Sequence, residues 1–178
     1  MHNCKRLGKT LINKMEILNI SLFFSTLLCS LVTGFILTYA IVVMPGLSKL
    51  DDKEFIKAFQ VTDGIIQNNQ PIFILIWVGS IISVLITIII SIFTLGLLEA
   101  WKIIFVSLFY LLGVQAITIT IHLPLNKRIQ NIDINSTNLQ SLNEERKNFE
   151  TKWNYFNNIR TVIAFLVTLF FLFIFSML

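Results

Sequence analysis

A tryptophan, an asparagine and an arginine lie at the start of the last apolar segment of the chain. Trp153, Asn157 and Arg160 are spaced by four and then three residues, so a helix places all three on one face. If that face points inward, the guanidinium and the amide can hydrogen-bond polar groups of neighbouring helices. The alternative is structural, because an arginine here can snorkel to the lipid headgroups and a tryptophan fits an interfacial aromatic belt.

A second set of polar residues lies at the end of the preceding apolar segment, in TITIHLPLNKR. Thr118, His122 and Asn126 are spaced by four and share one face if the helix persists beyond Pro124, which interrupts regular helical hydrogen bonding. Histidine exchanges its proton near neutral pH, so His122 is a candidate general base. The alternative is that His122 is an interfacial histidine, hydrogen-bonded to a neighbouring helix.

A third polar set is the run of amide side chains from Gln67 to Gln70, immediately before Pro71. Its simplest interpretation is an ordinary helix start, because proline suits the first turn and amide side chains cap it. If the chain crosses the membrane four times, however, all three polar sets fall on the same side. We therefore predict that they converge on a common pocket near one headgroup layer.

The elements that must position these residues are four long uncharged runs. The chain is 55% hydrophobic and 13% charged, whereas a soluble domain is about a quarter charged. A helix needs about 20 apolar residues to cross a bilayer, and backbone groups in lipid must be paired internally. We therefore predict four transmembrane helices. The uncharged runs are residues 17–44, 72–98, 103–123 and 161–178.

The connections predict two further helical features. Asp51 and Glu54 form a start similar to a capping box, and apolar residues follow at helical spacing, which indicates a short amphipathic interfacial helix between the first two spans. The apolar face is expected to contain Phe55, Phe59, Thr62 and Ile66, with Lys53, Lys57 and Asp63 elsewhere. Apolar spacing from Leu139 onward predicts that the last helix starts outside the membrane and continues without a break.

The predicted fold class is therefore all-α, a four-transmembrane-helix bundle with an interfacial helix and an extended last helix. Residues 1–16 form a basic N-terminal tail, and residues 17–178 form one domain. Small residues spaced by four on the first two spans are expected to let the helices approach closely. They are Ser21, Ser25, Cys29 and Thr33 on the first span, and Gly79, Ser83, Thr87 and Ser91 on the second. Cys4 and Cys29 are expected not to form a disulfide.

The composition of the spans argues against several kinds of functional site. No Asp or Glu is embedded in them, which excludes a paired-carboxylate site at membrane depth. The two histidines, His2 and His122, and the Cys/His spacing predict no metal site. Basic residues lie beside apolar runs and alternate with acids, so the expected partner is the lipid bilayer and not nucleic acid. The two long connections hold nine of the 14 Lys and Arg, which favours a cytoplasmic location for them, whereas the basic tail before the first span favours the opposite orientation.

Three stretches resemble the anthrone-oxygenase-like proteins, a bacterial and fungal family with a four-helix membrane domain of unknown function. They are GFILTYAIVVMPGLSKLDDKEFIKAFQVTDGIIQN, PLNKRI and KWNYFNNIRT, and the resemblance extends over residues 17–175. The matching positions are Pro45, Gly46, Gln67–Asn69, Pro124–Asn126, Trp153, Asn157 and Arg160. The chain departs from the family at His122, where Asn is common, and at Phe156, where a second Trp is common.

The resemblance implies a chemistry, because some fungal relatives oxidise anthrones to anthraquinones with molecular oxygen. Such a substrate, once deprotonated, reacts with oxygen without metal or flavin, so the enzyme needs a base and oxyanion donors. No cofactor is therefore expected, and the ligand is expected to be a small aromatic or quinone-like molecule. The candidate catalytic residues are His122, Arg160 and Asn157, and the candidate substrate-binding residues are Asn126, Trp153, Gln67 and Asn69.

The expected location is a bacterial inner membrane, crossed several times by the chain. The alternative function is non-catalytic: a helper subunit, a lipid-binding protein or a transport or envelope component. His122 separates the two, because its replacement by alanine affects only a protein that uses the imidazole.

Overall fold

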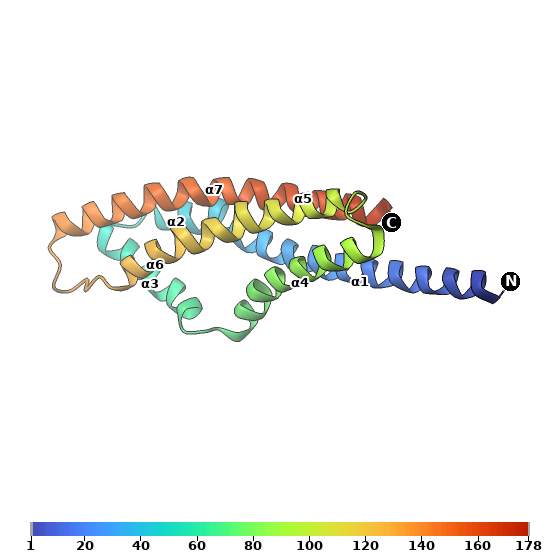
Figure 1. The fold of residues 1–178 in the computed structure, drawn as a ribbon. Helices are drawn as coiled ribbons and strands as arrows, with labels where there is room; N and C mark the ends of the chain where they lie inside the picture. The colour runs from blue at the N-terminus through green and yellow to red at the C-terminus, as the bar shows by residue number, and fades with distance from the viewer. Residues whose placement is uncertain (1, 178) are drawn as a thin grey trace.

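Four long helices run along one another in the computed structural model, which describes residues 2–177 and, for side chains, residues 12–177 (Figure 1). Within that described part, no β-strand occurs, and the predicted all-α bundle is confirmed. The helical elements are α1 (His2–Thr38), η1 (Tyr39–Val43), α2 (Met44–Leu47), α3 (Asp52–Gln67), α4 (Pro71–Leu95), α5 (Trp101–Tyr110), η2 (Leu111–Ala116), η3 (Thr118–His122), α6 (Leu123–Gln130) and α7 (Leu139–Met177). The three η elements are π-helical segments.

Four stretches are long and apolar enough to cross a membrane, as predicted, and the protein is a multi-pass membrane protein. They are Ile12–Leu47, Pro71–Leu95, Trp101–Gln130 and Leu139–Met177. The last helix begins at Leu139, and its 39 residues make it about 58 Å long, roughly twice the hydrocarbon thickness. The third span continues to Gln130, beyond the predicted end at Leu123. The first helix begins at His2, so residues 2–16, predicted as a basic tail, are helical and continuous with the first span. Cys4, which is expected not to form a disulfide with Cys29, lies outside the residues whose side chains are described.

Two prolines inside the helical spans are accommodated by widened turns. Pro45 follows η1 and Pro124 follows η3. The N–H of Met44 donates to the carbonyl of Tyr39 and that of Leu123 donates to the carbonyl of Thr118, five residues back instead of four. Proline lacks an N–H and its ring crowds the carbonyl four residues earlier, so a wider turn relieves both problems. The third span therefore persists through Pro124, and Tyr39 and His122 lie in the widened turns.

Within the bundle, α1 packs against α4 and α7 through small residues. The Ser25 hydroxyl lies 2.8 Å from that of Ser83 and 2.9 Å from that of Thr87, so the two predicted small-residue stripes meet. The Thr33 hydroxyl lies 3.0 Å from that of Thr168 on α7. Cys29 in the same stripe is buried with a free thiol. Close backbone approach and hydroxyl contacts thus hold the membrane part together.

A second apolar core lies at the end of the molecule opposite both termini, where α2, α3, α6 and the first half of α7 meet (Figure 1). We call this region the cap. The predicted amphipathic helix is confirmed as α3, and the Asp51 carboxylate caps it by accepting the Glu54 N–H at 2.8 Å. Phe55 and Phe59 of this helix are buried against α7, where the Phe59 and Phe149 ring centroids are 4.6 Å apart. The apolar face of α3 is therefore covered by protein.

Candidate functional site

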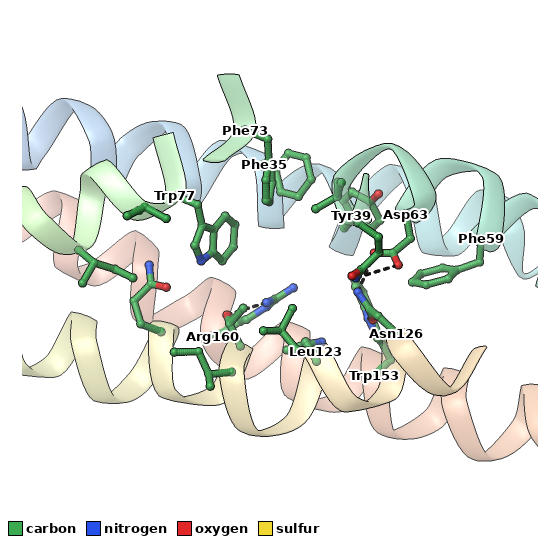
Figure 2. Close-up of a pocket in the computed structure, with 18 residues that line it drawn as sticks. Phe35, Tyr39, Phe59, Asp63, Phe73, Trp77, Leu123, Asn126, Trp153 and Arg160 are labelled. Atoms are coloured by element: carbon green, nitrogen blue, oxygen red, sulfur yellow. Dashed lines mark hydrogen bonds between the residues drawn. The ribbon is translucent and has the colours of Figure 1, made fainter. Parts of the chain in front are cut away.

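A cavity of about 270 Å³ lies where the bundle meets the cap (Figure 2). Pockets for small molecules usually have volumes of about 300–1,000 Å³, so this one suits a small ring system. Its walls come from α1, α3, α4, α7 and the third span. The lining residues are Phe35, Tyr39, Phe59, Asp63, Ile66, Gln67, Phe73, Trp77, Val78, Ile81, Gln115, Thr118, Ile119, His122, Leu123, Asn126, Trp153 and Arg160.

Arg160 is buried in the wall of this cavity and is only 4% exposed. Its Nε donates to Oδ1 of Asn157 at 3.0 Å and its Nη1 donates to the Thr118 hydroxyl at 2.9 Å. Figure 2 shows the guanidinium between Trp77 and Asn126. The arginine therefore does not snorkel to the headgroups. Among the described side chains no carboxylate forms an ion pair with Arg160, and a buried cation without a counter-charge favours an anionic or strongly polarised ligand oxygen.

Asn157 lies behind Arg160 and not in the cavity wall. It is fully buried, and its Nδ2 donates to the carbonyl of Ile36 on α1 at 3.2 Å, while its Oδ1 accepts from Arg160. The amide thus links α7 to α1 and fixes the direction of the guanidinium. Asn157 is placed to position Arg160, whereas the sequence assigned it a direct catalytic role.

His122 lines the cavity from η3 of the third span. Its side chain is buried, and neither Nδ1 nor Nε2 has a hydrogen-bond partner among the described residues. The interpretation of His122 as a histidine hydrogen-bonded to a neighbouring helix is therefore wrong. Its ring instead packs edge-on against Trp153, with centroids 5.0 Å apart. Because buried polar atoms are rarely unpaired and a neutral imidazole has one donor and one acceptor, a ligand in the cavity can use both.

A chain of hydrogen bonds ties the cavity wall to the cap. Nε1 of Trp153 donates to Oδ1 of Asn126 at 2.9 Å, and Nδ2 of Asn126 donates to Oδ1 of Asp63 at 2.8 Å. The other Asp63 oxygen accepts from Gln130 at 3.1 Å and from Gln67 at 3.3 Å. These bonds fix Trp153 and Asn126 in the wall. Burial raises the pKa of Asp63 above its ordinary value, and the three amide donors lower it in part.

The sequence reasoning missed Asp63, which it placed off the buried face of α3. The buried positions of this helix are Phe55, Ile56, Phe59 and Asp63, while Thr62, assigned to the apolar face, is exposed. Spacings of three and four from Ile56 through Phe59 lead to Asp63, so a search for polar residues in phase with apolar ones would have found it.

The amide run before Pro71 is divided by the structure. Gln67 lines the cavity beside Asp63. Asn69 does not line it, because it is exposed in the turn between α3 and α4 with a positive φ of 61°. Asparagine tolerates that backbone conformation better than most residues, which explains its presence there. The Gln70 side chain accepts the Phe73 N–H and caps α4, in agreement with an ordinary helix start.

Aromatic side chains from α1, η1 and α4 form the wall that faces Arg160, and sequence reasoning missed them all. Phe73 and Trp77 stack at 5.2 Å, Phe35 lies 5.1 Å from Phe73, and Tyr39 lies 5.6 Å from Trp153, all between ring centroids. Planar aromatic ligands fit such surfaces by stacking or edge contacts. In runs already rich in Phe and Ile, no sequence signal distinguishes a cavity wall from a lipid-facing surface.

The end of the cavity nearest the bundle centre carries one more polar group. Nε2 of Gln115 donates to the Tyr110 hydroxyl at 2.7 Å, and that hydroxyl lies 2.7 Å from the Ser80 hydroxyl. Oε1 of Gln115 is buried without a partner among the described residues. No group of three potential metal ligands occurs among the residues that could be searched in this structure. The arrangement thus offers a cationic donor, a free imidazole and an amide acceptor between aromatic walls.

This geometry defines a class, a multi-pass helical membrane protein with a polar-lined aromatic cavity near one membrane surface. The model of the family described as anthrone oxygenase matches residues 73–170, more than half of the chain, and the chain belongs to that family. No curated protein and no solved structure matches the chain. The matched range contains His122, Asn126, Trp153 and Arg160, whereas Asp63 precedes it.

Proposed function

We propose that the protein is a membrane oxygenase that promotes the oxidation of an anthrone-like or hydroquinone-like aromatic molecule by molecular oxygen. One observation carries the proposal: among the described residues, the imidazole of His122 has no hydrogen-bond partner and the guanidinium of Arg160 has no carboxylate partner, and both groups line one aromatic cavity. Proton abstraction next to a carbonyl requires a base and a donor that stabilises the developing oxyanion, and the same cavity contains both.

The reaction balances with oxygen as the oxidant. The imidazole of His122 removes a proton from the methylene carbon of an anthrone, and the electron pair moves toward the carbonyl oxygen, which accepts a hydrogen bond from Arg160. The carbanion transfers electrons to dioxygen, a carbon–oxygen bond forms, and the imidazolium returns the proton to give a hydroperoxide. Loss of water then leaves a second carbonyl. One anthrone and one dioxygen thus give one anthraquinone and one water.

The remaining candidate residues have supporting roles in this scheme. Thr118 and Asn157 hold the guanidinium, and Asn126 holds Trp153 against the ligand plane. Gln67 lies beside Asp63 in the same wall. The inner membrane of a bacterium is the proposed location.

The test is oxygen consumption and anthraquinone formation by the purified protein in lipid nanodiscs supplied with anthrone. His122→Ala is expected to lower kcat by about 100-fold or more, the usual contribution of a general base, and Arg160→Gln by a similar factor. Tyr155→Ala is the matched control, because Tyr155 lies on α7 and is 62% exposed outside the cavity.

Unchanged turnover in both variants would refute the proposal. A wild-type protein that binds the aromatic ligand but consumes no oxygen would instead support the non-catalytic alternative, a membrane protein that binds or carries such molecules.

A further inference from the structure

The cavity has an aliphatic edge that reaches the outer surface of the bundle. Val78 on α4 and Ile119 on η3 both line it, yet they are 45% and 56% exposed. Leu123 lines the same edge and is 45% exposed. Side chains that face both the cavity and the outside mark an opening between α4 and the third span, which we call the lateral opening.

We expect the lateral opening to face lipid, because it lies between two apolar helices. Both helices that frame it are membrane spans. Val78 is seven residues beyond Pro71, where α4 begins, so it lies about 10 Å along that helix from its start. In Figure 1 the first turns of α4 lie away from α6, whereas α4 packs against α1 and α5.

Chemistry and size together limit what can occupy this site. The polar groups, His122 and Arg160, lie inside, whereas the opening is lined by aliphatic side chains alone. A volume of about 270 Å³ holds one ring system and leaves no space for a long chain. A molecule that satisfies both regions has an oxygenated aromatic head inside the cavity and an aliphatic chain outside it, in the bilayer.

Building on the proposed function, we propose that the substrate is a membrane-dissolved amphiphile with a phenol- or quinone-type head and an aliphatic chain. It enters from the hydrocarbon layer between α4 and the third span. Its head reaches Arg160 and His122, and its chain remains in lipid beside Val78 and Ile119. A water-soluble ring compound that enters past Asp63 and Gln67 is the competing outcome.

The test uses two quinones with the same ring, tetramethylbenzoquinone and its relative in which one methyl is replaced by a decyl chain. Bound quinone quenches tryptophan fluorescence, and two of the three tryptophans, Trp77 and Trp153, line the cavity. A Trp101→Phe background removes the third. Stopped-flow measurement of this quenching in nanodiscs then gives association rates. The same measurement on Arg160→Gln gives the quenching that does not depend on binding in the cavity.

The lateral opening is narrowed by Val78→Phe combined with Ile119→Phe. This variant is expected to slow association of the decyl quinone by a factor about tenfold or more larger than the factor by which it slows the small quinone. Retained binding of the small quinone also reports that the variant is folded. The matched control is Ile86→Phe with Leu112→Phe, on the same two spans, 46% and 67% exposed and outside the cavity.

Equal decyl-quinone rates in the narrowed and control variants would overturn the lateral opening. In that case Arg160-dependent quenching by the small quinone would leave the proposed function intact. If neither quinone gives Arg160-dependent quenching in the background protein, both the proposed function and this inference fail.

Discussion

The two apolar cores of this protein differ in the contacts that join their helices. In the bundle, α1 meets its neighbours through Ser25, Cys29 and Thr33, with hydroxyls paired across helices. In the cap, the contacts are made by large aromatic rings, including Phe59 and Phe149. The bundle core also contains large side chains such as Leu22 and Phe171, so the difference lies in the small polar residues through which α1 contacts its neighbours.

The difference follows from the solvent. Outside the bilayer, removing an aromatic side chain from water supplies the driving force, so large rings stabilise best. Inside it, lipid tails are as apolar as the side chains, and helices associate through close packing and hydrogen bonds. The cavity lies at the boundary of the two regimes: the third span and α7 supply His122 and Arg160, and the cap holds Trp153 through Asn126 and Asp63.

The largest expected effect is in the cap. Phe149→Ala removes a ring that is 3% exposed and contacts Phe59, and we expect a loss of about 3–5 kcal/mol in the free energy of unfolding. Chemical unfolding in mixed micelles measures it. Tyr155→Ala on the same helix is the control, with an expected change below about 0.5 kcal/mol. Similar losses in both variants would contradict a solvent-driven aromatic core.

The next effect concerns the polar rim of the cap. Arg146 donates to the carbonyls of Leu50 at 2.7 Å and Ser48 at 2.9 Å, and it pairs with Asp52 at 3.0 Å. Arg146→Ala is expected to cost about 2–3 kcal/mol in the same assay, because it leaves partly buried acceptors unpaired. Arg128→Ala, which removes an ion pair on an exposed side chain, should cost less than about 1 kcal/mol. Equal losses of unfolding free energy in Arg146→Ala and Arg128→Ala would show that the hydrogen bonds of Arg146 to the backbone carbonyls do not stabilise the cap.

Close approach inside the bundle is tested at Gly113. A Cβ added there would lie 2.7 Å from Cγ2 of Ile163 on α7, so Gly113→Ala is expected to destabilise by about 1–3 kcal/mol. Combining it with Ile163→Ala removes the obstructing atoms, and the double variant should be less destabilised than the two single changes predict together. Strict additivity would show that this contact does not limit the approach of the helices.

A smaller effect is expected from the hydroxyl pairs between α1 and α4. Ser25→Ala removes two contacts, to Ser83 and Thr87, and should cost about 0.6 kcal/mol, the average for such bonds in membranes. A loss as large as that of Phe149→Ala would erase the contrast between the two cores.

The smallest effect is a change in pH dependence at the boundary. Burial raises the folded-state pKa of Asp63 above 3.8, so the folded chain holds this proton more tightly than the unfolded chain does. Stability attributable to Asp63 therefore falls as pH rises from 3.8 through the higher folded value, and Asp63→Asn should remove that fall. Thermal unfolding between about pH 2 and about pH 7 measures the difference, because this range extends to both sides of the ordinary carboxyl pKa of about 4.

Asp133 gives the control with the opposite sign. The Asn135 N–H and the Ser136 hydroxyl lower the pKa of Asp133, so its contribution to stability is present above 3.8 and is lost as the pH falls through the lowered value. Asp133→Asn should therefore reduce the loss of stability at low pH. It should not remove the decrease in stability that Asp63 causes at higher pH. If Asp63→Asn and Asp133→Asn change the pH dependence of stability in the same way, the burial of Asp63 is contradicted.

Much of the architecture was predictable because its causes are local. Lipid requires long apolar helices, so the four runs gave four spans, and the start of the last helix at Leu139 followed from apolar spacing. The pairing of Ser25 with Ser83 followed from small residues repeated every fourth position. Topology alone brought His122, Asn126 and Arg160 to one side of the membrane.

The cavity itself needed more than local rules. Sequence reasoning placed Asp63 on the wrong face of α3, assigned Asn69 to the site and missed the aromatic wall that includes Tyr39 and Trp77. It also ended the third span at Leu123, since it did not anticipate that a widened turn at His122 would carry the helix past Pro124. Each of these depends on which neighbour a given helix face meets.

By itself, the sequence determined a membrane-embedded four-helix chain with few polar side chains gathered at one end, because hydropathy and helical period act residue by residue. Only the tertiary structure decided that Arg160 points into the cavity and that, among the described side chains, it has no carboxylate partner and His122 has no hydrogen-bond partner. The physical reason is rotation: the angle of each helix about its own axis is set by packing against its neighbours.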